Sequence, residues 1–339
     1  CPFRHRTRYY DSETWLYYYG YRYYDPSVTK WISKDPLGEA GGWNLTAFCG
    51  NDPVNTFDPL GLAAYLFDGT WVDKDDQKNP VESNVARLWK NYGGTVWYRE
   101  GVGCGNRVGG IRGFFSKVFG GFGGAGWDSR LEWMYKKLEQ TYVDDSDPEN
   151  KQIDIFGFSR GAGMARDFAN MIKERGIMYK GKWVYPEIRF LGVFDTVASS
   201  GLPGNDINPG KELSLPDNVL SAAHALSGHE VRGAFPLTLF ADDPRVDQQW
   251  FSGVHSDTGG AYGAGRVQGY IPLYWMYTKA WEAGVPLGAF PQDYYSAIMR
   301  YRFRYDLDWN ELWSSDIASI STCPFLNSSR PMSDSSTDA

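Results

Sequence analysis

Cysteine and histidine are scarce in this chain of 339 residues, with four of each. The cysteines, at positions 1, 49, 104 and 323, have no spacing typical of a zinc site or a redox motif. They do not require a disulfide framework, and the histidines do not cluster. We therefore expect no metal site and no cofactor.

Long apolar runs and an excess of positive charge are also lacking. No run is long enough for a transmembrane helix, and no signal peptide is visible. The formal net charge of −7 argues against a nucleic-acid partner. A hydrophobic content of 42% allows one or two domains with a substantial core. Because the sequence starts without Met, we expect it to be the C-terminal part of a longer protein.

The sequence is organised around residues 152–166, QIDIFGFSRGAGMAR. An apolar strand is predicted first, then a tight turn at Ser159, then a helix. Gly-x-Ser-x-Gly is a weak pattern in a glycine-rich chain, but a strand before it and a helix after it are typical of a nucleophile elbow. A serine hydroxyl needs such a turn to project toward a base. The backbone N–H of Arg160, at the start of the helix, would then face a developing oxyanion.

Strands and helices alternate from residue 63 onward. Apolar runs predict strands at 64–67, 95–103, 153–158 and 187–195, and a further strand that starts at 248 and ends at His255 and Asp257. Amphipathic spacing predicts helices at 82–93, 127–142, 216–232 and 271–284. This order indicates an α/β fold, with a parallel sheet that has helices on both faces.

Four of the predicted strands end in a group suited to chemistry: Asp68, Ser159, Asp195 and His255. The carboxyl ends of parallel strands meet at one edge, so these side chains should gather there. The order Ser159, Asp195, His255 is that of α/β-hydrolases. His255 would take the proton of Ser159, and Asp195 would orient the imidazole ring. Asp257 is the alternative acid, or a group that fixes the loop.

Competing interpretations apply to several of these residues. An aspartate at a strand end is usually a turn former, and the glycine-rich loop around His255 could be only structural. His224 and His229 fall within the predicted helix 216–232, where packing or surface roles are the more common ones. His255 is the stronger candidate base because glycines surround it and a predicted strand precedes it.

The first 62 residues are rich in tyrosine, and Tyr-Tyr-Asp occurs at 9–11 and again at 23–25. Aromatic residues between turn signals predict short antiparallel strands. Residues 9–62, ending in NDPVNTFDPLGL, closely resemble the end of the conserved core of Rhs/YD-repeat proteins. The resemblance implies a β-cage around a C-terminal toxin. It also implies that Asp35 and Asp58 cleave the chain after Leu62.

The same resemblance shows one departure, because Lys34 stands where the family usually has arginine before the first Asp-Pro. Lysine does not reproduce the planar, bidentate contact of arginine. In isolation, Asp-Pro also simply makes turns. Two carboxylates sharing a proton can act as acid and base, so cleavage after Leu62 remains one of two interpretations.

A second resemblance covers residues 64–284. The motifs FDGTW, SNVARLW, IFGFSRGAGMAR, FLGVFDTVAS, HALSGHEVRGAF and WFSGVHSDTGGAY, in this order, look like the GxSxG α/β-hydrolase domain of type VI secretion lipase effectors. The resemblance implies a triad of Ser159, Asp195 and His255, with Gly69 or Thr70 as a second oxyanion donor and Asp68 beside them. It implies hydrolysis of glycerophospholipid acyl esters in a rival bacterium.

The resemblances also imply partners and a place of action. The partners would be a membrane phospholipid substrate, an Rhs cage, type VI spike proteins and a cognate immunity protein. The protein would be made in the cytoplasm, secreted by the type VI system, and act at the target-cell membrane from the periplasmic side. The alternatives are a soluble carboxylesterase or thioesterase, or a catalytically idle cargo or binding module.

The composition also predicts how the chain divides into domains. We expect an Rhs-core segment at 1–62, a hydrolase domain at 63–313, and a Ser- and Asp-rich tail at 314–339. Within the hydrolase domain, residues 101–126 form a basic, amphipathic stretch between glycines. A lid that opens on a membrane and a helix packed on the core both fit this pattern.

Overall fold

The computed structural model describes short stretches between residues 3 and 32, and then most of the hydrolase region. The described ranges there are 63–70, 72–75, 82–102, 104, 126–142, 153–198, 211–230, 237–262, 267–305, 307 and 312–314. Asp35, Asp58 and Leu62 lie outside the described residues, as do most of the stretch 101–126 and the tail after residue 314. The predictions made for them stay predictions.

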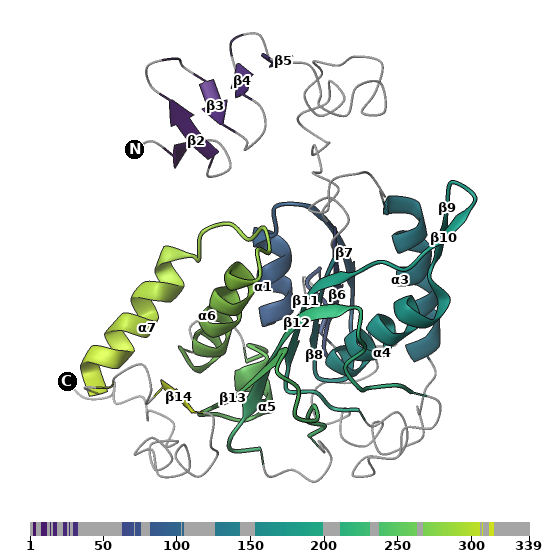
Figure 1. The fold of residues 1–339 in the computed structure, drawn as a ribbon. Coiled ribbons are helices and arrows are strands. Elements are labelled where there is room, and N and C mark those ends of the chain that lie inside the picture. Colours follow the sequence, from purple (N-terminus) through teal and green to yellow (C-terminus); the bar gives the residue numbers. More distant parts are fainter. Residues whose placement is uncertain are drawn as a thin grey trace, which may run out of the picture.

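The N-terminal stretches form a small antiparallel sheet, as predicted from the tyrosine-rich pattern (Figure 1). Its five strands pair in chain order, each with the next. They are β1 (Phe3–Arg4), β2 (Arg8–Asp11), β3 (Leu16–Tyr18), β4 (Tyr23–Asp25) and β5 (Lys30–Trp31). The first Tyr-Tyr-Asp sequence ends β2 and the second forms β4, and β3 lies between these two strands.

A seven-stranded sheet organises the rest of the chain, in the order β14-β13-β12-β11-β8-β6-β7. Six strands are parallel, and only the edge strand β14 is antiparallel to its neighbour. The strands are β6 (Ala63–Phe67), β7 (Thr95–Arg99), β8 (Ile153–Phe158), β11 (Ile188–Phe194), β12 (Val219–Ser227), β13 (Val246–Phe251) and β14 (Trp313–Ser314). The strand order reverses between β6 and β8, where open α/β sheets form their sites.

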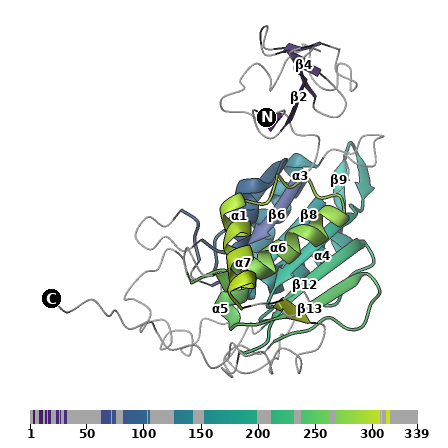
Figure 2. The same cartoon turned by 90° about the vertical axis from the view of Figure 1, so that its left-hand side faces the viewer.

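Helices cover both faces of this sheet, as predicted (Figures 1 and 2). One face carries α3 (Trp127–Thr141) and α4 (Arg160–Arg175), beside the hairpin of β9 (Ile177–Tyr179) and β10 (Lys182–Val184). The other face carries α1 (Asn84–Asn91), α6 (Val267–Glu282) and α7 (Gln292–Tyr305). The single turn α5 (His255–Thr258) connects β13 to α6. The fold is therefore α/β-hydrolase-like.

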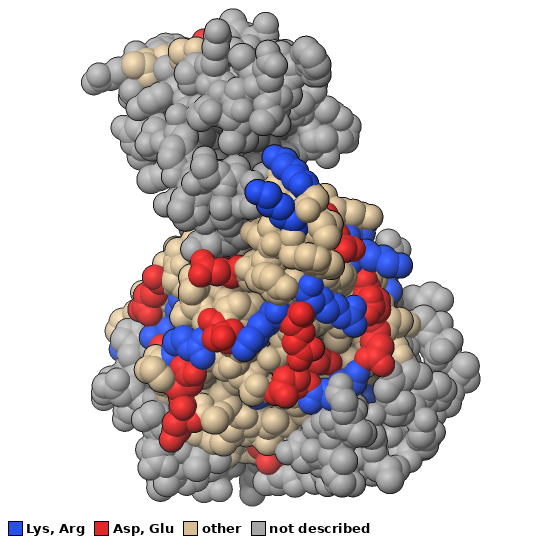
Figure 3. Space-filling view, turned by 45° about the vertical axis from the view of Figure 1, so that its right-hand side comes forward, with Lys and Arg blue, Asp and Glu red and all other residues tan. Residues whose placement is uncertain are grey.

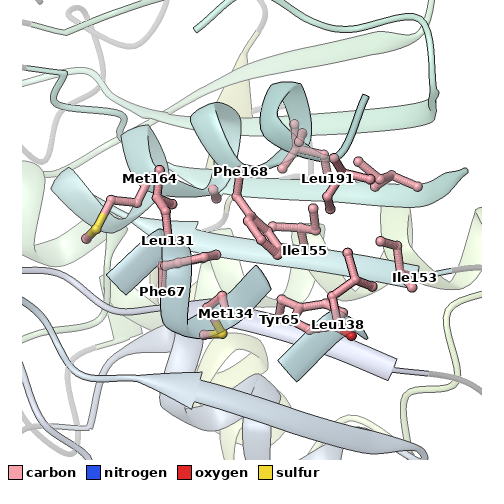
Figure 4. Close-up of a cluster of buried hydrophobic side chains, with 14 of the residues drawn as sticks. Tyr65, Phe67, Leu131, Met134, Leu138, Ile153, Ile155, Met164, Phe168 and Leu191 are labelled. Carbon is pink, nitrogen blue, oxygen red and sulfur yellow. The ribbon is translucent and has the colours of Figure 1, made fainter. Parts of the chain in front are cut away.

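Alternation along the strands divides the buried side chains between the two faces. In β6, Tyr65 and Phe67 belong to the cluster under α3 and α4, where both rings lie 5.5 Å from the ring of Phe168 (Figure 4). Ala64 and Leu66 belong to the cluster under α1 and α6. Because successive side chains of a strand point to opposite faces, a strand buried on both faces has a continuous apolar sequence.

The continuous apolar sequence of a strand buried on both faces explains why the helix predicted at 216–232 was wrong. Residues 216–232, predicted to be a helix carrying His224 and His229, contain the inner strand β12, and His229 lies after it. β12 is flanked by parallel strands on both sides and is buried along most of its length. A short run of small apolar residues has no period that separates a buried strand from a helix. Helix α7, strand β14 and the hairpin of β9 and β10 were not predicted from the sequence.

The surface in Figure 3 carries both charge signs, with Lys and Arg side chains interspersed among Asp and Glu side chains. Two exposed ion pairs are Arg175–Glu132 at 2.6 Å and Lys173–Asp217 at 2.9 Å. Exposed pairs of this kind contribute little to stability. The face in view has no large region of a single sign.

Phe168 tests the packing between α4 and the sheet. Phe168→Ala should lower the free energy of unfolding by about 3–5 kcal/mol, because the fully buried ring leaves a cavity against Tyr65 and Phe67. Phe303 is 80% exposed on α7, so Phe303→Ala is the matched control and should change stability by less than about 0.5 kcal/mol. Urea unfolding followed by tryptophan fluorescence gives both values. Equal effects of the two changes would contradict this packing.

Candidate active site

Ser159 lies in the turn between β8 and α4, in a strained conformation with φ 59° and ψ −125°. Its N–H donates to Phe194 O at 3.0 Å, which ties the turn to the end of β11. A Cβ on Gly161 would lie 2.3 Å from Phe67 O, so only glycine lets α4 begin this close to β6. The predicted elbow is therefore present, with the serine at the carboxyl edge of the sheet.

Ser159, His255 and Asp195 form a continuous line of hydrogen bonds. His255 Nε2 lies 2.8 Å from Ser159 Oγ, and His255 Nδ1 lies 2.6 Å from Asp195 Oδ2. All three side chains are buried. The Nδ1–H of a neutral imidazole can donate to the carboxylate, which leaves Nε2 free to accept the serine proton. The three residues predicted as a triad are thus brought together in the corresponding order.

The structure corrects where His255 comes from. β13 ends at Phe251, and His255 is the first residue of α5, with three residues between it and that strand. The prediction that His255 ends a strand was therefore wrong, although its place at the sheet edge was right. The Phe158 ring, 4.9 Å from the His255 ring, supports the imidazole from β8. The local sequence does not show that His255 begins a helix, because Gly253 and Gly259 flank this single helical turn.

Ser227 fixes Asp195 and was not anticipated from the sequence. Its N–H donates to Asp195 Oδ1 at 2.8 Å, and its hydroxyl donates to Oδ2 at 2.7 Å. Burial alone would raise the pKa of Asp195, but the hydrogen bonds from His255 and Ser227 outweigh burial and lower it. The carboxylate therefore stays ionised. The motif HALSGHEVR contained this residue, but only the pairing of β12 with β11 places it beside Asp195.

Asp257 does not face the imidazole nitrogen that Asp195 contacts. Its carboxylate accepts the N–H of Val254 at 3.1 Å and caps the start of α5. The N–H of His255 donates to Glu230 Oε2 at 3.2 Å. His229 Nδ1 accepts the N–H of Gly253 at 2.9 Å. Asp257 thus takes the loop-fixing role, with Glu230 and His229 contributing to the same loop.

His224 is fully buried in β12. Its Nε2 accepts the N–H of Thr196 at 3.2 Å, and its Nδ1 lies 3.3 Å from Gln248 Oε1. Burial lowers the pKa of His224 to about 3, so the ring is neutral. The expected packing role fits these contacts, although the residue lies in a strand and not in a helix.

Asp68 lies at the end of β6, next to the Ser159 turn, with its carboxylate fully buried. Oδ1 accepts the N–H of Gly69 at 2.7 Å, and Oδ2 accepts the hydroxyls of Ser83 at 2.6 Å and Tyr98 at 2.7 Å. The Gly69 N–H, one of the predicted oxyanion donors, is therefore already engaged. Thr70 follows in the same turn, and the N–H of Arg160 belongs to the first turn of α4, which has no intrahelical acceptor.

Two other features, a membrane-spanning helix and a metal site, are absent from the described residues. No helix among them is long and apolar enough to cross a bilayer. Within those same ranges, no group of three or more His, Cys, Asp or Glu side chains is arranged to hold a metal ion.

The sheet order, the elbow and the flanking helices define an α/β-hydrolase-like protein. Residues 64–185 and 182–279 match the model of the catalytic domain of Tle1-like phospholipase effectors of type VI secretion systems. This match covers more than half of the chain. The chain belongs to that family.

Curated relatives match a short part of the chain, in its N-terminal region. The toxin protein Tse5 of Pseudomonas aeruginosa is 46% identical over 61 residues, which are 18% of this chain and 5% of Tse5. RhsB of Dickeya dadantii is 42% identical over 65 residues, which are 19% of this chain and 4% of RhsB. The matched stretches span only 4% to 32% of such relatives' own lengths. The predicted resemblance to Rhs proteins is confirmed for this region.

Solved structures are distantly similar. One, of the Tle1 effector bound to the VgrG spike from the type 6 secretion system, is 17% identical, with a TM-score of 0.49 over 73% of this chain and 80% of that chain. Another, of an uncharacterized protein from Pseudomonas aeruginosa, is 21% identical, with a TM-score of 0.47 over 70% of this chain and 48% of that chain.

Asp68 makes stability depend on pH in a defined direction. Burial raises its pKa from 3.8 to about 6. Its favourable contribution is therefore complete below about pH 4 and lost as the pH rises through about 6. The unfolding free energy of the wild type minus that of Asp68→Asn should fall by roughly 3 kcal/mol between pH 4 and pH 7.

The measurement is urea unfolding at several pH values. The control is Asp242→Asn, which makes the same substitution at an exposed aspartate outside the Asp68 network. A difference that stays constant for Asp68→Asn, or that grows with pH, would contradict the assignment.

Proposed function

We propose that the chain hydrolyses acyl ester bonds of membrane glycerophospholipids. Ser159 is the nucleophile, His255 the general base and Asp195 the group that orients and stabilises the imidazolium. The observation that carries the proposal is the hydrogen-bonded line from Asp195 through His255 to Ser159 at a strained elbow. Membership of a phospholipase effector family supports the choice of substrate.

The reaction runs in two halves on this line. His255 Nε2 takes the hydroxyl proton as Ser159 Oγ attacks the acyl carbon, and the carbonyl oxygen gains the negative charge. The lysophospholipid oxygen leaves with the proton from His255, and the acyl group stays on Ser159. Water then attacks this ester, His255 takes the water proton and returns it to Ser159, and the fatty acid departs. Asp195 remains a carboxylate throughout.

The donors of the oxyanion hole are backbone N–H groups near Ser159 that do not already donate to another residue. We assign one donor to Arg160, whose N–H lies at the N-terminus of α4, where the helix dipole also favours negative charge. The second donor is Thr70, since the Gly69 N–H is already held by Asp68 at 2.7 Å. Asp68 then shapes the turn that presents Thr70, and it takes no part in proton transfer.

The biological setting belongs to the same proposal. The Rhs-like region (1–62), the hydrolase domain (63–313) and the tail (314–339) would form an effector that reaches a rival cell by type VI secretion. Its partners would be spike proteins, an Rhs cage and an immunity protein, and its site of action the periplasmic side of the target membrane. Asp35 and Asp58 would release the domain by cutting after Leu62.

Two alternatives predict different measurements. A soluble carboxylesterase or thioesterase would hydrolyse a short soluble ester. Its activity would not increase when the substrate is an aggregated lipid. An idle cargo or binding module would not turn over either substrate. Assaying the purified protein on diacylphospholipid vesicles and, in parallel, on a short soluble ester, with analysis of the products of both, separates the three cases.

Ser159→Ala tests the nucleophile. It should lower turnover of phospholipid vesicles by about 10⁴-fold or more and leave the melting temperature nearly unchanged, because one buried hydroxyl is removed from a site that stays packed. Fatty acid and lysophospholipid are measured by mass spectrometry. A well-folded Ser159→Ala protein with normal turnover would rule out this mechanism.

The histidines test the base. His255→Ala should be nearly as damaging as Ser159→Ala. Folded His224→Ala should keep kcat within several-fold, because its neutral ring bonds to Thr196 and Gln248 and packs on Phe240. The kcat of His229→Ala should lie between those of His255→Ala and His224→Ala, because the change removes the hydrogen bond to Gly253, just before α5. Steady-state kinetics on a short ester measure all three variants. Loss of activity in His224→Ala with retention in His255→Ala would refute the assignment.

A further inference from the structure

The position of His255 depends on a helix too short to hold itself. α5 has four residues, and one turn of helix does not satisfy its own terminal carbonyl groups. Its first N–H groups are held by Glu230 and by its own Asp257. What holds its C-terminal end therefore also decides where the imidazole lies.

That end is held by the first turn of α1, which is far away in sequence. Asn84 Nδ2 donates to Thr258 O at 2.9 Å, and the backbone N–H of Asn84 donates to Gly259 O at 2.8 Å. Arg87 Nη1 lies 3.4 Å from Gly260 O. Three successive carbonyl groups at the end of α5 thus accept hydrogen bonds from two residues of one helix.

Asn84 has no exposed surface, and its amide is fully used. Nδ2 also donates to Gly269 O at 3.0 Å, in the first turn of α6, and Oδ1 accepts from Arg87 Nη1 at 2.8 Å. The Arg87 guanidinium lies 5.2 Å from the Tyr270 ring centroid. A buried amide with every donor engaged fixes a geometry tightly, because each lost hydrogen bond leaves an unsatisfied buried group.

α1 is itself anchored beside the serine. Ser83, the N-cap of α1, accepts the N–H of Ala86 at 3.0 Å and donates to Asp68 at 2.6 Å. Asp68 in turn holds the Gly69 N–H in the turn next to Ser159. The start of α1 therefore links the turn at the end of β6 to the helix that carries His255.

Two glycines transmit this support to the imidazole. A Cβ on Gly260, where φ is +70°, would lie 2.4 Å from Asn84 Oδ1, so glycine is needed for the contact. A Cβ on Gly259 would lie 2.1 Å from the Phe158 ring, which packs on His255. A shift of the end of α5 would therefore press on Phe158 and move the imidazole relative to Ser159.

We propose that Asn84, supported by Arg87, is a positioning residue that sets the orientation of His255 by holding the C-terminal end of α5. This inference rests on the proposed function, because it takes His255 to be the general base. Asn84 does not touch the reacting atoms. It keeps the distances of 2.8 Å to Ser159 and 2.6 Å to Asp195 within the tolerance that proton transfer requires.

The test compares Asn84→Ala and Asn84→Asp with a matched control. Asn170, in α4, is also buried and donates to three backbone carbonyls, those of Arg166, Glu212 and Ser214, away from His255. Asn170→Ala removes a similar set of hydrogen bonds. Asn84→Asp keeps the size of the side chain but places an oxygen against the carbonyls of Thr258 and Gly269.

Kinetics with p-nitrophenyl butyrate should separate positioning from stability. Both Asn84 variants should lower kcat by about ten- to a hundred-fold with KM nearly unchanged, since the base is misplaced while the acyl pocket remains. Asn170→Ala should lower the melting temperature comparably and keep kcat within about three-fold. Equal kcat in the Asn84 and Asn170 variants would overturn the proposal. So would failure of both Asn84 variants to fold.

Proton NMR distinguishes failure of this inference from failure of the proposed function. The Nδ1 proton shared by His255 and Asp195 should give a low-field signal that is absent in His255→Ala. We expect Asn84→Ala to shift or broaden this signal and Asn170→Ala to leave it in place. A signal unchanged in Asn84→Ala overturns the positioning role even if the wild type hydrolyses no ester, a result that would separately refute the proposed function.

Discussion

The close approach of α4 to strands β6 and β8 is the constraint on which the rest of the site depends. Gly161 removes the side chain that would meet Phe67 O, and Ser159 then takes a backbone conformation that is costly outside glycine. The sheet supports this strain because Phe168 and its neighbours pack α4 firmly onto it. A serine held this way needs no movement to meet its base.

Around that serine, buried polar groups are satisfied in linked sets. Asp195 is shared by His255 and Ser227, and Asp68 by Gly69, Ser83 and Tyr98. An unpaired buried charge is expensive, so each set admits few arrangements. Two residues of the same type differ in their pKa, because partners lower the pKa of Asp195 while burial raises that of Asp68.

Prediction from the sequence succeeded where a pattern is local. The strand before Ser159 and the helix after it follow from a continuous apolar run and a glycine-rich turn, and the parallel sheet follows from alternating elements. It failed at β12, because a strand buried on both faces has no alternation to detect. It also failed at α5, because one turn of helix is formed by capping contacts from Asp257 and Glu230.

The sequence by itself determined the elbow, the α/β fold and the order of Ser159, Asp195 and His255, since each depends on neighbouring residues or on chain order. Tertiary structure decided that Asp195 and not Asp257 meets the imidazole, and that Ser227 and Asn84 support them. The contacts responsible join residues 32, 60, 96 and 174 positions apart. Local periodicity in the sequence does not predict such pairs, because strand order and helix packing bring them together only when the sheet forms.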